Sequence, residues 1–411
     1  MAKDGIDTPE DLPQSMKRRS FLGVTGLGLA SGILGLGASL QMTSTRALAQ
    51  GGALEGKDGL DLLNDRPVNA QTPAHLLDDA ITPIDRHFVR NNGVVPDDTS
   101  AEGWMLTVDG LVDQPMELSI DDLRDQFEVV TMALALECGG NGRAMFDPPA
   151  SGNQWTYGAI ACSEWTGVRL RDVLEAAGVH ESVVYTGHYG ADGHLSGDPE
   201  RSPLSRGVPI DKAMTDNVLI AFEMNGEPLH PLNGAPLRLV VPGWPGSCSQ
   251  KWLTRIELRD QKHDGTKMAA PSYSVPSYPV APGTDVPLED FETIHAMPVK
   301  SLITHPQDGA DVGSEFEVRG HAWAGDRTVQ KMEVSSDHGE SWQEADLDDP
   351  VNDGAWQNWR TTVTVPQSGY YEIWARATDS EGVMQPFAIK WNPKGYLNNS
   401  FHKVAVQAEA A

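Results

Sequence analysis

The stretch Val130-Thr-Met-Ala-Leu-Ala-Leu136 runs directly into Glu137-Cys138-Gly139-Gly140-Asn141-Gly142-Arg143. The first run is short and mostly apolar, which predicts a buried strand, and the glycines that follow predict a turn. Cys138 therefore lies at a strand end, where glycine lets the backbone approach a ligand closely. Arg143 would favour the thiolate form of this cysteine. The pattern alone leaves open a half-buried structural thiol or a disulfide partner at Cys138.

Metal sites built only from protein ligands have no support in the sequence. It contains no Cys-x-x-Cys pair, no His-Glu-x-x-His and no Cys-x-x-Cys-His segment, the patterns of zinc, iron–sulfur and covalent haem sites. A Gly-rich phosphate loop with Lys-Ser/Thr and a Gly-x-Gly-x-x-Gly segment opening a βαβ unit are also absent. A redox centre at Cys138 would thus require a cofactor that brings the metal's other ligands with it.

The chain is strongly acidic. Its 411 residues include 58 Asp and Glu against 31 Lys and Arg, a formal net charge of −27, and 39% are hydrophobic. Length and hydrophobic share predict two or three globular domains and argue against a membrane protein. The negative field repels polyanions, which excludes most nucleic-acid partners. The three cysteines, Cys138, Cys162 and Cys248, are too few for a disulfide scaffold.

The first 49 residues have the pattern of an export signal. Lys17-Arg18-Arg19-Ser20-Phe21-Leu22 is a twin-arginine motif, a glycine-rich apolar run follows, and Ala47-Leu48-Ala49 is a small-x-small cleavage site. A transmembrane anchor is the alternative, but glycines interrupt the apolar run. We expect a twin-arginine signal peptide over 1–49, export to the periplasm and no membrane span after cleavage. Because this route carries folded proteins, it favours a cofactor inserted before export.

Prolines divide the rest of the chain. Six of them fall between residues 268 and 298, which excludes long helices and favours an extended connector. We therefore expect a first domain at 65–268, a connector at 269–295 and a second domain at 296–406. In the first domain, apolar runs at 129–136 and 237–241 predict strands. Apolar residues at helical spacing before Gly178 predict a helix over 169–177. This mixture indicates an α+β fold, with a mixed α/β fold as the alternative.

The second expected domain has a different pattern. Its β-rich runs at 315–321, 329–335, 358–365 and 370–378 are separated by turn signals such as Asp337-His338-Gly339 and Asn352-Asp353-Gly354. Strands at this spacing predict an antiparallel, immunoglobulin-like β-sandwich. A sandwich by itself suggests packing or dimerisation rather than chemistry.

Several motifs, in a constant order, resemble the sulfite oxidase family of molybdopterin enzymes. They lie at residues 135–143, 155–160, 165–174, 225–229, 236–243 and 251–253. The resemblance covers about 75–405 and implies a molybdenum-cofactor domain followed by an immunoglobulin-like dimerisation domain. Within the family, residues 188–197, 203–212 and 243–251 look closest to the molybdenum subunits of bacterial sulfane dehydrogenases.

The resemblance implies a role for each matching residue. Cys138 matches the thiolate that binds molybdenum, a soft ligand suited to a metal already held by a dithiolene. Arg90 and Arg143 match substrate-site arginines, and Trp155 matches a tryptophan lining the pocket. The matching cofactor-contacting positions are Phe88, Asn91, Asn92, His188, Asn233, Arg238, Ser249, Gln250 and Lys251. Taken singly, each has a plain structural alternative, such as a surface arginine or a core tryptophan.

The chain also departs from the family pattern. Many sulfite oxidases have His where Asn92 and Asn233 stand, and Arg where Cys248 stands. The family's active-site tyrosine aligns with Leu204, and Arg206 close by would be a replacement cation. A late substrate-site arginine aligns with Lys394. These changes put free sulfite in doubt as the physiological substrate but leave the cofactor assignment intact.

The implied activity is oxidation of a reduced sulfur centre, sulfane sulfur or sulfite, at molybdenum, with the added oxygen coming from water. The substrate would be an anion, free or bound to a carrier. Because the sequence has no haem motif, the electrons would leave to a separate c-type cytochrome, in a homodimer or a heterotetramer with that partner. Two alternatives remain: a stand-alone sulfite dehydrogenase using a monohaem cytochrome, and a non-enzymatic exported binding or scaffold protein.

Overall fold

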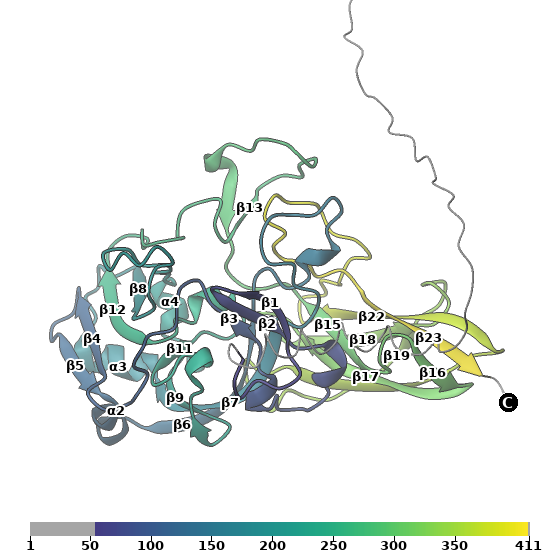
Figure 1. Cartoon of the computed structure of the whole chain (residues 1–411), viewed down its shortest axis with the longest axis horizontal. Coiled ribbons are helices and arrows are strands. Elements are labelled where there is room, and N and C mark those ends of the chain that lie inside the picture. The colour runs from purple at the N-terminus through teal and green to yellow at the C-terminus, as the bar shows by residue number, and fades with distance from the viewer. Residues whose placement is uncertain (1–53, 410–411) are drawn as a thin grey trace, which may run out of the picture. The chain divides into compact units, whose positions relative to one another are not determined.

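Residues 54–409 are described by a computed structural model of the chain (Figure 1). They lie within one compact unit. The expected signal peptide falls outside the described residues. Among the helices of the described part, none combines the length and the apolar character needed to cross a membrane.

The apolar run before Cys138 forms strand β6, Val129–Glu137, as predicted. It pairs antiparallel along its whole length with β7, Ile160–Arg169, and the sheet continues in the order β6-β7-β9-β10 with β11 beside β9. The other strands of this sheet are β9 (Leu219–Met224), β10 (Glu227–Pro228) and β11 (Arg238–Val240). β11 matches the strand expected at 237–241. Cys138 is thus the first residue beyond the end of β6.

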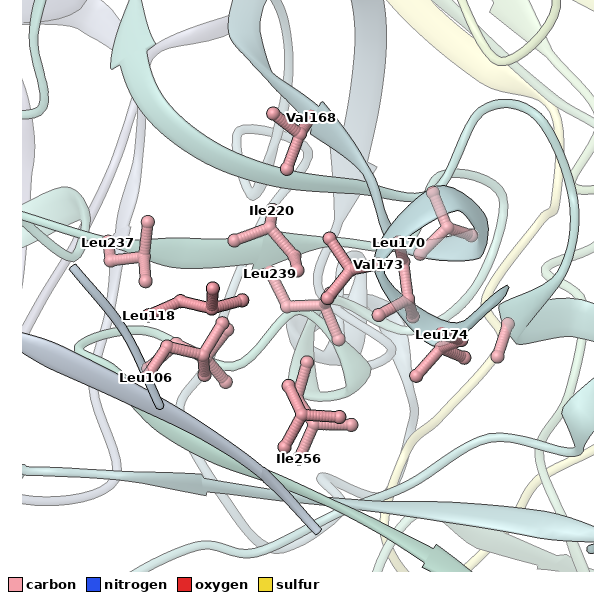
Figure 2. Close-up of a cluster of buried hydrophobic side chains, with 14 of the residues drawn as sticks. Leu106, Leu118, Val168, Leu170, Val173, Leu174, Ile220, Leu237, Leu239 and Ile256 are labelled. Carbon is pink, nitrogen blue, oxygen red and sulfur yellow. The ribbon is translucent and has the colours of Figure 1, made fainter. Parts of the chain in front are cut away.

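A second sheet has the order β5-β4-β12-β8, and its strands are β4 (Met105–Gly110), β5 (Met116–Ser119), β8 (Tyr185–Gly190) and β12 (Leu253–Arg259). Figure 2 shows the apolar core formed with it: Leu106 of β4 and Ile256 of β12 lie in one cluster with Ile220 of β9. Burial of these apolar side chains is the main favourable term that holds the two sheets together.

Helices are few and short. The helix expected at 169–177 is α3, Leu170–Ala177; it ends at Gly178, whose φ of 73° is a left-handed value that glycine adopts without strain. α2 (Ile120–Gln126) begins with a capping box between Ser119 and Asp122, and α4 (Ile210–Ala213) is a single turn. Strands therefore dominate the described residues, and the α+β prediction is confirmed only in part.

Two small sheets complete the N-terminal part of the structure. β1 (Asp61–Asp65), β2 (Val68–Gln71) and β3 (Val89–Arg90) form one of them. The Pro-rich connector contains no α-helix, as predicted, but it is not simply extended. Its β13 (Ser274–Pro276) and β14 (Phe291–Thr293) pair as a two-stranded sheet, and β13 stands apart from the larger sheets in Figure 1.

The C-terminal segment consists of two sheets around a shared apolar core. One sheet is β15 (Lys300–His305), β17 (Glu315–Trp323), β21 (Gln357–Thr364) and β20 (Asp346–Leu347). The other is β16 (Ala310–Gly313), β23 (His402–Glu409), β22 (Gly369–Asp379), β18 (Val329–Ser335) and β19 (Gln343–Glu344). Residues of both sheets, including Val318 and Ile373, meet in one core. The four expected strands are β17, β18, β21 and β22.

The structure adds to that prediction and departs from it at one edge. β15, β16 and β23 were not expected from the apolar patterning, and β16 pairs with β23 in parallel rather than antiparallel fashion. The immunoglobulin-like assignment stays a prediction.

The two sandwich sheets are joined to the N-terminal part by specific polar contacts. The Arg319 guanidinium and the Asp78 carboxylate lie 2.6 Å apart, and His321 Nε2 lies 2.6 Å from the Leu77 carbonyl oxygen. Trp356 Nε1 donates to the Ala80 carbonyl at 2.7 Å. These contacts attach residues 77–80 to β17 and to Trp356, the residue before β21.

Replacement of Leu174 by Ala should destabilise the protein strongly. Leu174 is fully buried in the core of Figure 2, so the change removes apolar contacts and leaves a cavity, which typically costs about 2–5 kcal/mol. The matched control is Leu288→Ala, because Leu288 is 60% exposed. Urea denaturation should show a large shift for the first variant and almost none for the second. Equal shifts would contradict the position of this core.

Candidate functional site

Cys138 lies at the junction of two hollows. It is 7% exposed, and its backbone N–H donates to the Ala159 carbonyl at 2.9 Å, which fixes the chain as it leaves β6. The inner hollow has about 640 Å³ of space outside protein atoms and is lined by Cys138 together with Phe88, Asn233, Arg238, Lys251 and other residues. The outer hollow has about 780 Å³ and is lined by Cys138 together with Arg90, Arg143, Lys267, Lys394 and other residues. One thiol therefore faces both spaces.

Most of the expected cofactor-contacting residues come together at the inner hollow. Those that line it are Phe88, Asn92, Asn233, Arg238, Ser249, Gln250 and Lys251. Asn91 lies directly behind them and accepts a hydrogen bond from Lys251 Nζ through its side-chain oxygen. The residues come from both ends of β3, from η4 (Pro231–Asn233), from β11 and from the loop before β12, which lie far apart in the sequence.

Three buried cations surround the inner hollow. Burial lowers the pKa of Arg238 to about 9 and that of Lys57 to about 7, and it holds the pKa of Lys251 well below its usual range. Within the part of the chain that the structure describes, none of them forms a salt bridge with a carboxylate. Arg238 donates instead to the carbonyl oxygen of Asn233 at 2.7 Å. Buried charges without partners are costly, so this arrangement favours an anionic ligand.

Several buried polar atoms at the inner hollow have no hydrogen-bond partner among residues 54–409. They are Asn91 Nδ2, Gln250 Oε1, Asp192 Oδ1 and the Ser247 hydroxyl. Buried polar groups are nearly always paired in native proteins, so these atoms point to a ligand with both donors and acceptors. Burial also raises the pKa of Asp192 to about 6.

The outer hollow is cationic. Four cations line it, Arg90, Arg143, Lys267 and Lys394, and no Asp or Glu is among its described lining residues. Asn92 connects it with the inner hollow: its side-chain oxygen accepts from Arg90 Nη2 at 2.9 Å and from Lys267 Nζ at 2.6 Å. A concentration of positive charge in an acidic protein would attract a small anion to the side of Cys138.

Arg143 is held rigidly beside Cys138. Its Nε donates to the Lys394 carbonyl at 2.6 Å, and its Nη1 donates to the Asn153 carbonyl at 2.9 Å. The guanidinium packs closely on Gly152 and on other glycines, where a Cβ atom would collide with it. The glycines thus leave the space that the guanidinium occupies. Its Nη2 group makes no hydrogen bond to any residue that the structure describes.

Tyr273 brings an aromatic hydroxyl to the site from the Pro-rich connector and lines both hollows. Leu204, which aligns with the family's tyrosine, also lines the inner hollow. The Tyr273 ring stacks on Tyr396 with centroids 5.6 Å apart, and Asn92 Nδ2 lies 3.5 Å from the Tyr273 hydroxyl. Burial raises the pKa of Tyr396 to about 12, so its hydroxyl stays protonated at neutral pH.

Three expected site residues lie behind the hollows rather than along them. Trp155 is fully buried and contacts Phe88 edge-to-face, with centroids 6.5 Å apart. Arg206 is also buried; its guanidinium lies 4.7 Å from the centre of the Tyr273 ring and donates to the Lys267 carbonyl. His188 bonds Thr186, and burial lowers its pKa to about 3. None of the three is among the lining residues of either hollow.

Three residues at the site carried no usable signal in the sequence. Lys57 lies before the expected start of the first domain, yet its ammonium group donates to Asn233 Oδ1. Lys267 and Tyr273 lie where that domain was expected to end and the connector to begin. Both have positive φ angles, 68° and 46°, in a conformation that only the folded context imposes on such residues. Their neighbouring prolines predicted irregular backbone but no chemistry.

The donor set suits a cofactor that holds a metal by itself. Among the described residues, no group of three or more His, Cys, Asp or Glu side chains gathers into a metal site. Cys138 alone is a soft ligand at the junction of the hollows, so a metal there needs its remaining ligands from a cofactor. The buried cations and the unpartnered polar atoms of the inner hollow fit the phosphate and the polar ring edges of a molybdopterin.

Two family models match the chain. The model of the oxidoreductase molybdopterin binding domain matches residues 92–267, and that of the Mo-co oxidoreductase dimerisation domain matches residues 291–409. The first range ends at Lys267 and includes Cys138 with most of the inner hollow.

Curated relatives agree with these matches. Sulfite oxidase of Gallus gallus is 34% identical over 361 residues, which cover 84% of this chain and 77% of the relative. Mitochondrial sulfite oxidase of Rattus norvegicus is 35% identical, over 85% of this chain and 65% of the rat protein. A nitrate reductase of Hordeum vulgare is 32% identical over 84% of this chain and 41% of the relative. The chain thus spans about two thirds of the rat enzyme's length and less than half of the barley enzyme's.

A solved structure has the same fold over almost the whole chain. The sulfane dehydrogenase SoxCD from Paracoccus pantotrophus matches with a TM-score of 0.71 and 27% identity, over 93% of this chain and 93% of the other. Together with a cradle that fits molybdopterin beside the Cys138 thiol, these matches establish that the chain belongs to the sulfite oxidase family of molybdopterin oxidoreductases.

Proposed function

We propose that the chain oxidises a reduced sulfur centre, sulfane sulfur or sulfite, and passes the electrons to a c-type cytochrome. The observation that carries this proposal is the position of Cys138, between a cradle for molybdopterin and an open hollow lined by four cations. A molybdenum cofactor bound there supplies the two-electron oxidation of the sulfur, since the protein side chains have no such chemistry.

The protein's first task is to hold the cofactor. Arg238 and Lys251, which line the inner hollow, would bind its phosphate, and the ligand's charge would offset the cost of burying theirs. Lys57 lies behind them, where it donates to Asn233, and adds positive charge. Asn91, Gln250 and Ser247 offer their unpartnered atoms to the polar edges of the ring system. Cys138 would bind the metal as a thiolate.

The second task is to bind and orient an anionic substrate. Arg90 and Arg143 are fixed by hydrogen bonds before any substrate arrives, so little reorganisation is needed when the anion binds. Lys267 and Lys394 add positive charge on the open side of the hollow. Substrate sulfur would approach between these groups and the side of Cys138.

The finer substrate class is sulfane sulfur on a carrier, as in thiosulfate oxidation. The similarity to the SoxCD sulfane dehydrogenase supports it. A stand-alone sulfite dehydrogenase is the second candidate, supported by 34–35% identity to sulfite oxidases. Turnover of free sulfite compared with turnover of a thiol-bound sulfane on the same preparation distinguishes the two.

The acceptor and the cell compartment complete the proposal. The net charge of −27 would steer a basic cytochrome to the protein surface. Two chains would dimerise through the C-terminal segment, and binding of the cytochrome to each of them would give a heterotetramer. The twin-arginine motif at residues 17–22 supports export to the periplasm. Loss of export on replacing both arginines by lysines would test the location independently of the chemistry.

Replacement of Cys138 by Ser should abolish turnover and leave the fold intact, because a hydroxyl is a poor ligand for this metal and nearly the same size as the thiol. Wild-type protein matured with cofactor should contain nearly one molybdenum per chain, whereas a non-enzymatic scaffold would contain none. Cys162→Ala is the control, because Cys162 is buried away from both hollows and burial raises its pKa to about 12. Near-normal activity of the Cys138 variant contradicts the ligand assignment.

Replacement of Lys394 by Met should raise KM for the anionic substrate by roughly tenfold and change kcat little. The change removes one charge-assisted contact at the entrance of the outer hollow, and such contacts contribute about 1.5–3 kcal/mol. Lys390→Met is matched in chemistry and lies four residues away, outside the lining of this hollow. Steady-state kinetics at constant ionic strength makes the comparison. An equal effect of both variants would indicate general charge rather than this site.

Cofactor-free protein should become more stable as pH rises from about 7 to about 9. Burial lowers the pKa of Lys57 to about 7, whereas an unfolded lysine has a pKa near 10.4, so the unfolded state binds more protons in this interval. A bound phosphate restores a higher pKa and should flatten the dependence. Thermal midpoints of the cofactor-free and loaded forms measure the difference, and parallel curves contradict a phosphate beside Lys57.

A further inference from the structure

A buried ion pair lies directly beside Cys138 and joins the two parts of the chain. Lys300 Nζ and Glu137 Oε1 are 2.9 Å apart, and their side chains are 5% and 4% exposed. Glu137 is the last residue of β6, and Lys300 is the first residue of β15 in the C-terminal segment. The second oxygen of Glu137 accepts from Trp323 Nε1 at 2.8 Å.

Lys300 and Trp323 reach Glu137 because of the sandwich's own register. They are directly paired residues on β15 and β17, and paired residues project their side chains from the same face of a sheet. The end of the first sandwich sheet thus presents one cation and one indole N–H to a single carboxylate. Burial of the carboxylate is possible because both of its oxygens are hydrogen-bonded.

The same network closes around the turn that carries Cys138. Lys300 Nζ also donates to the Asn141 carbonyl at 3.1 Å, and Asn141 Nδ2 donates to Glu137 Oε1 at 3.0 Å. Asn141 N–H in turn donates to the Cys138 carbonyl at 2.8 Å. Lys300 therefore holds the residue before the cysteine and the residue three positions after it.

We propose that Lys300 is a positioning residue for Cys138, so that the C-terminal segment helps to build the metal site as well as the contact between subunits. It fixes both ends of the turn at residues 138–141. It also pairs with the buried carboxylate of Glu137, one residue before the cysteine, which would otherwise be left without a counter-charge. This proposal rests on the role of Cys138 as the metal ligand in the proposed function.

Lys300→Met tests the proposal in the holoenzyme. Methionine fills similar space without charge or donors, so the turn loses its clamp and Glu137 loses its partner. We expect an altered Mo(V) electron paramagnetic resonance spectrum, a shifted molybdenum potential and a kcat lower by about ten- to hundredfold, with KM little changed. Lys300→Arg keeps the charge and should recover part of the wild-type spectrum.

Arg319→Met is the matched control. It breaks a second ion pair between the same two parts, Arg319 with Asp78. Arg319 lies on the same strand as Trp323 but does not contact the Cys138 turn. The change should lower the thermal midpoint and leave the Mo(V) spectrum unchanged. If Lys300→Met also lowers the thermal midpoint but leaves the Mo(V) spectrum unchanged, the proposal is overturned, even if kcat falls.

Folding failure and failure of the proposed function are both separable from this result. If Lys300→Met does not fold, the double variant Glu137→Gln with Lys300→Met removes both charges, keeps an acceptor for Trp323 and still frees the Asn141 carbonyl. An altered Mo(V) spectrum of that variant supports the clamp, and a wild-type spectrum overturns it. X-ray absorption at the molybdenum edge counts sulfur ligands in wild type and in Cys138→Ser. An equal count in those two refutes the ligand role itself, independently of Lys300.

Discussion

Buried positive charge without a carboxylate partner is the constraint on which the site depends. Arg238, Lys251 and Lys57 surround the inner hollow, and burial depresses the pKa of each. Their charge disfavours the folded state of the bare protein and favours any anion that fills the hollow. Cofactor binding and folding are therefore coupled, because a ligand that binds only the folded state stabilises it. That coupling is consistent with export after folding, as the proposed signal requires.

The whole chain is negatively charged, whereas the outer hollow beside Cys138 is lined by positive charges. The chain carries a net charge of −27, yet four cations and no described Asp or Glu line the outer hollow. Buried polar contacts hold the cations in place; Arg143, for instance, donates to two carbonyl groups from different loops. Most acidic residues lie outside this hollow, where a negative surface would suit a basic partner. The outer hollow itself is suited to an anion.

Predictions from the sequence were correct for features that depend on one short segment of the chain. Apolar patterning predicted β6 and α3. The glycine-rich motif after β6 pointed to Cys138 and Arg143, and both residues line the outer hollow. Such predictions failed where the site is assembled over long distances. Tyr273 reaches the hollows from the connector and Lys57 from a segment before the expected domain. No local pattern marks either residue. Trp155, His188 and Arg206 were expected at the site but lie behind the hollow walls.

The segments that supply the lining of the outer hollow explain how related chains can differ in substrate. Sulfite oxidases and nitrate reductases both align with this chain over 84% or more of its length, so the shared fold does not choose the reaction. The inner cradle is built mostly from the first part of the chain, and Tyr273 of the connector lines both hollows. The outer hollow also takes Lys394 and Tyr396 from the C-terminal segment. Because Lys394 and Tyr396 do not line the cradle, their side chains can change while the cofactor stays bound. Substrate choice would then reside in the residues that the C-terminal segment and the connector contribute.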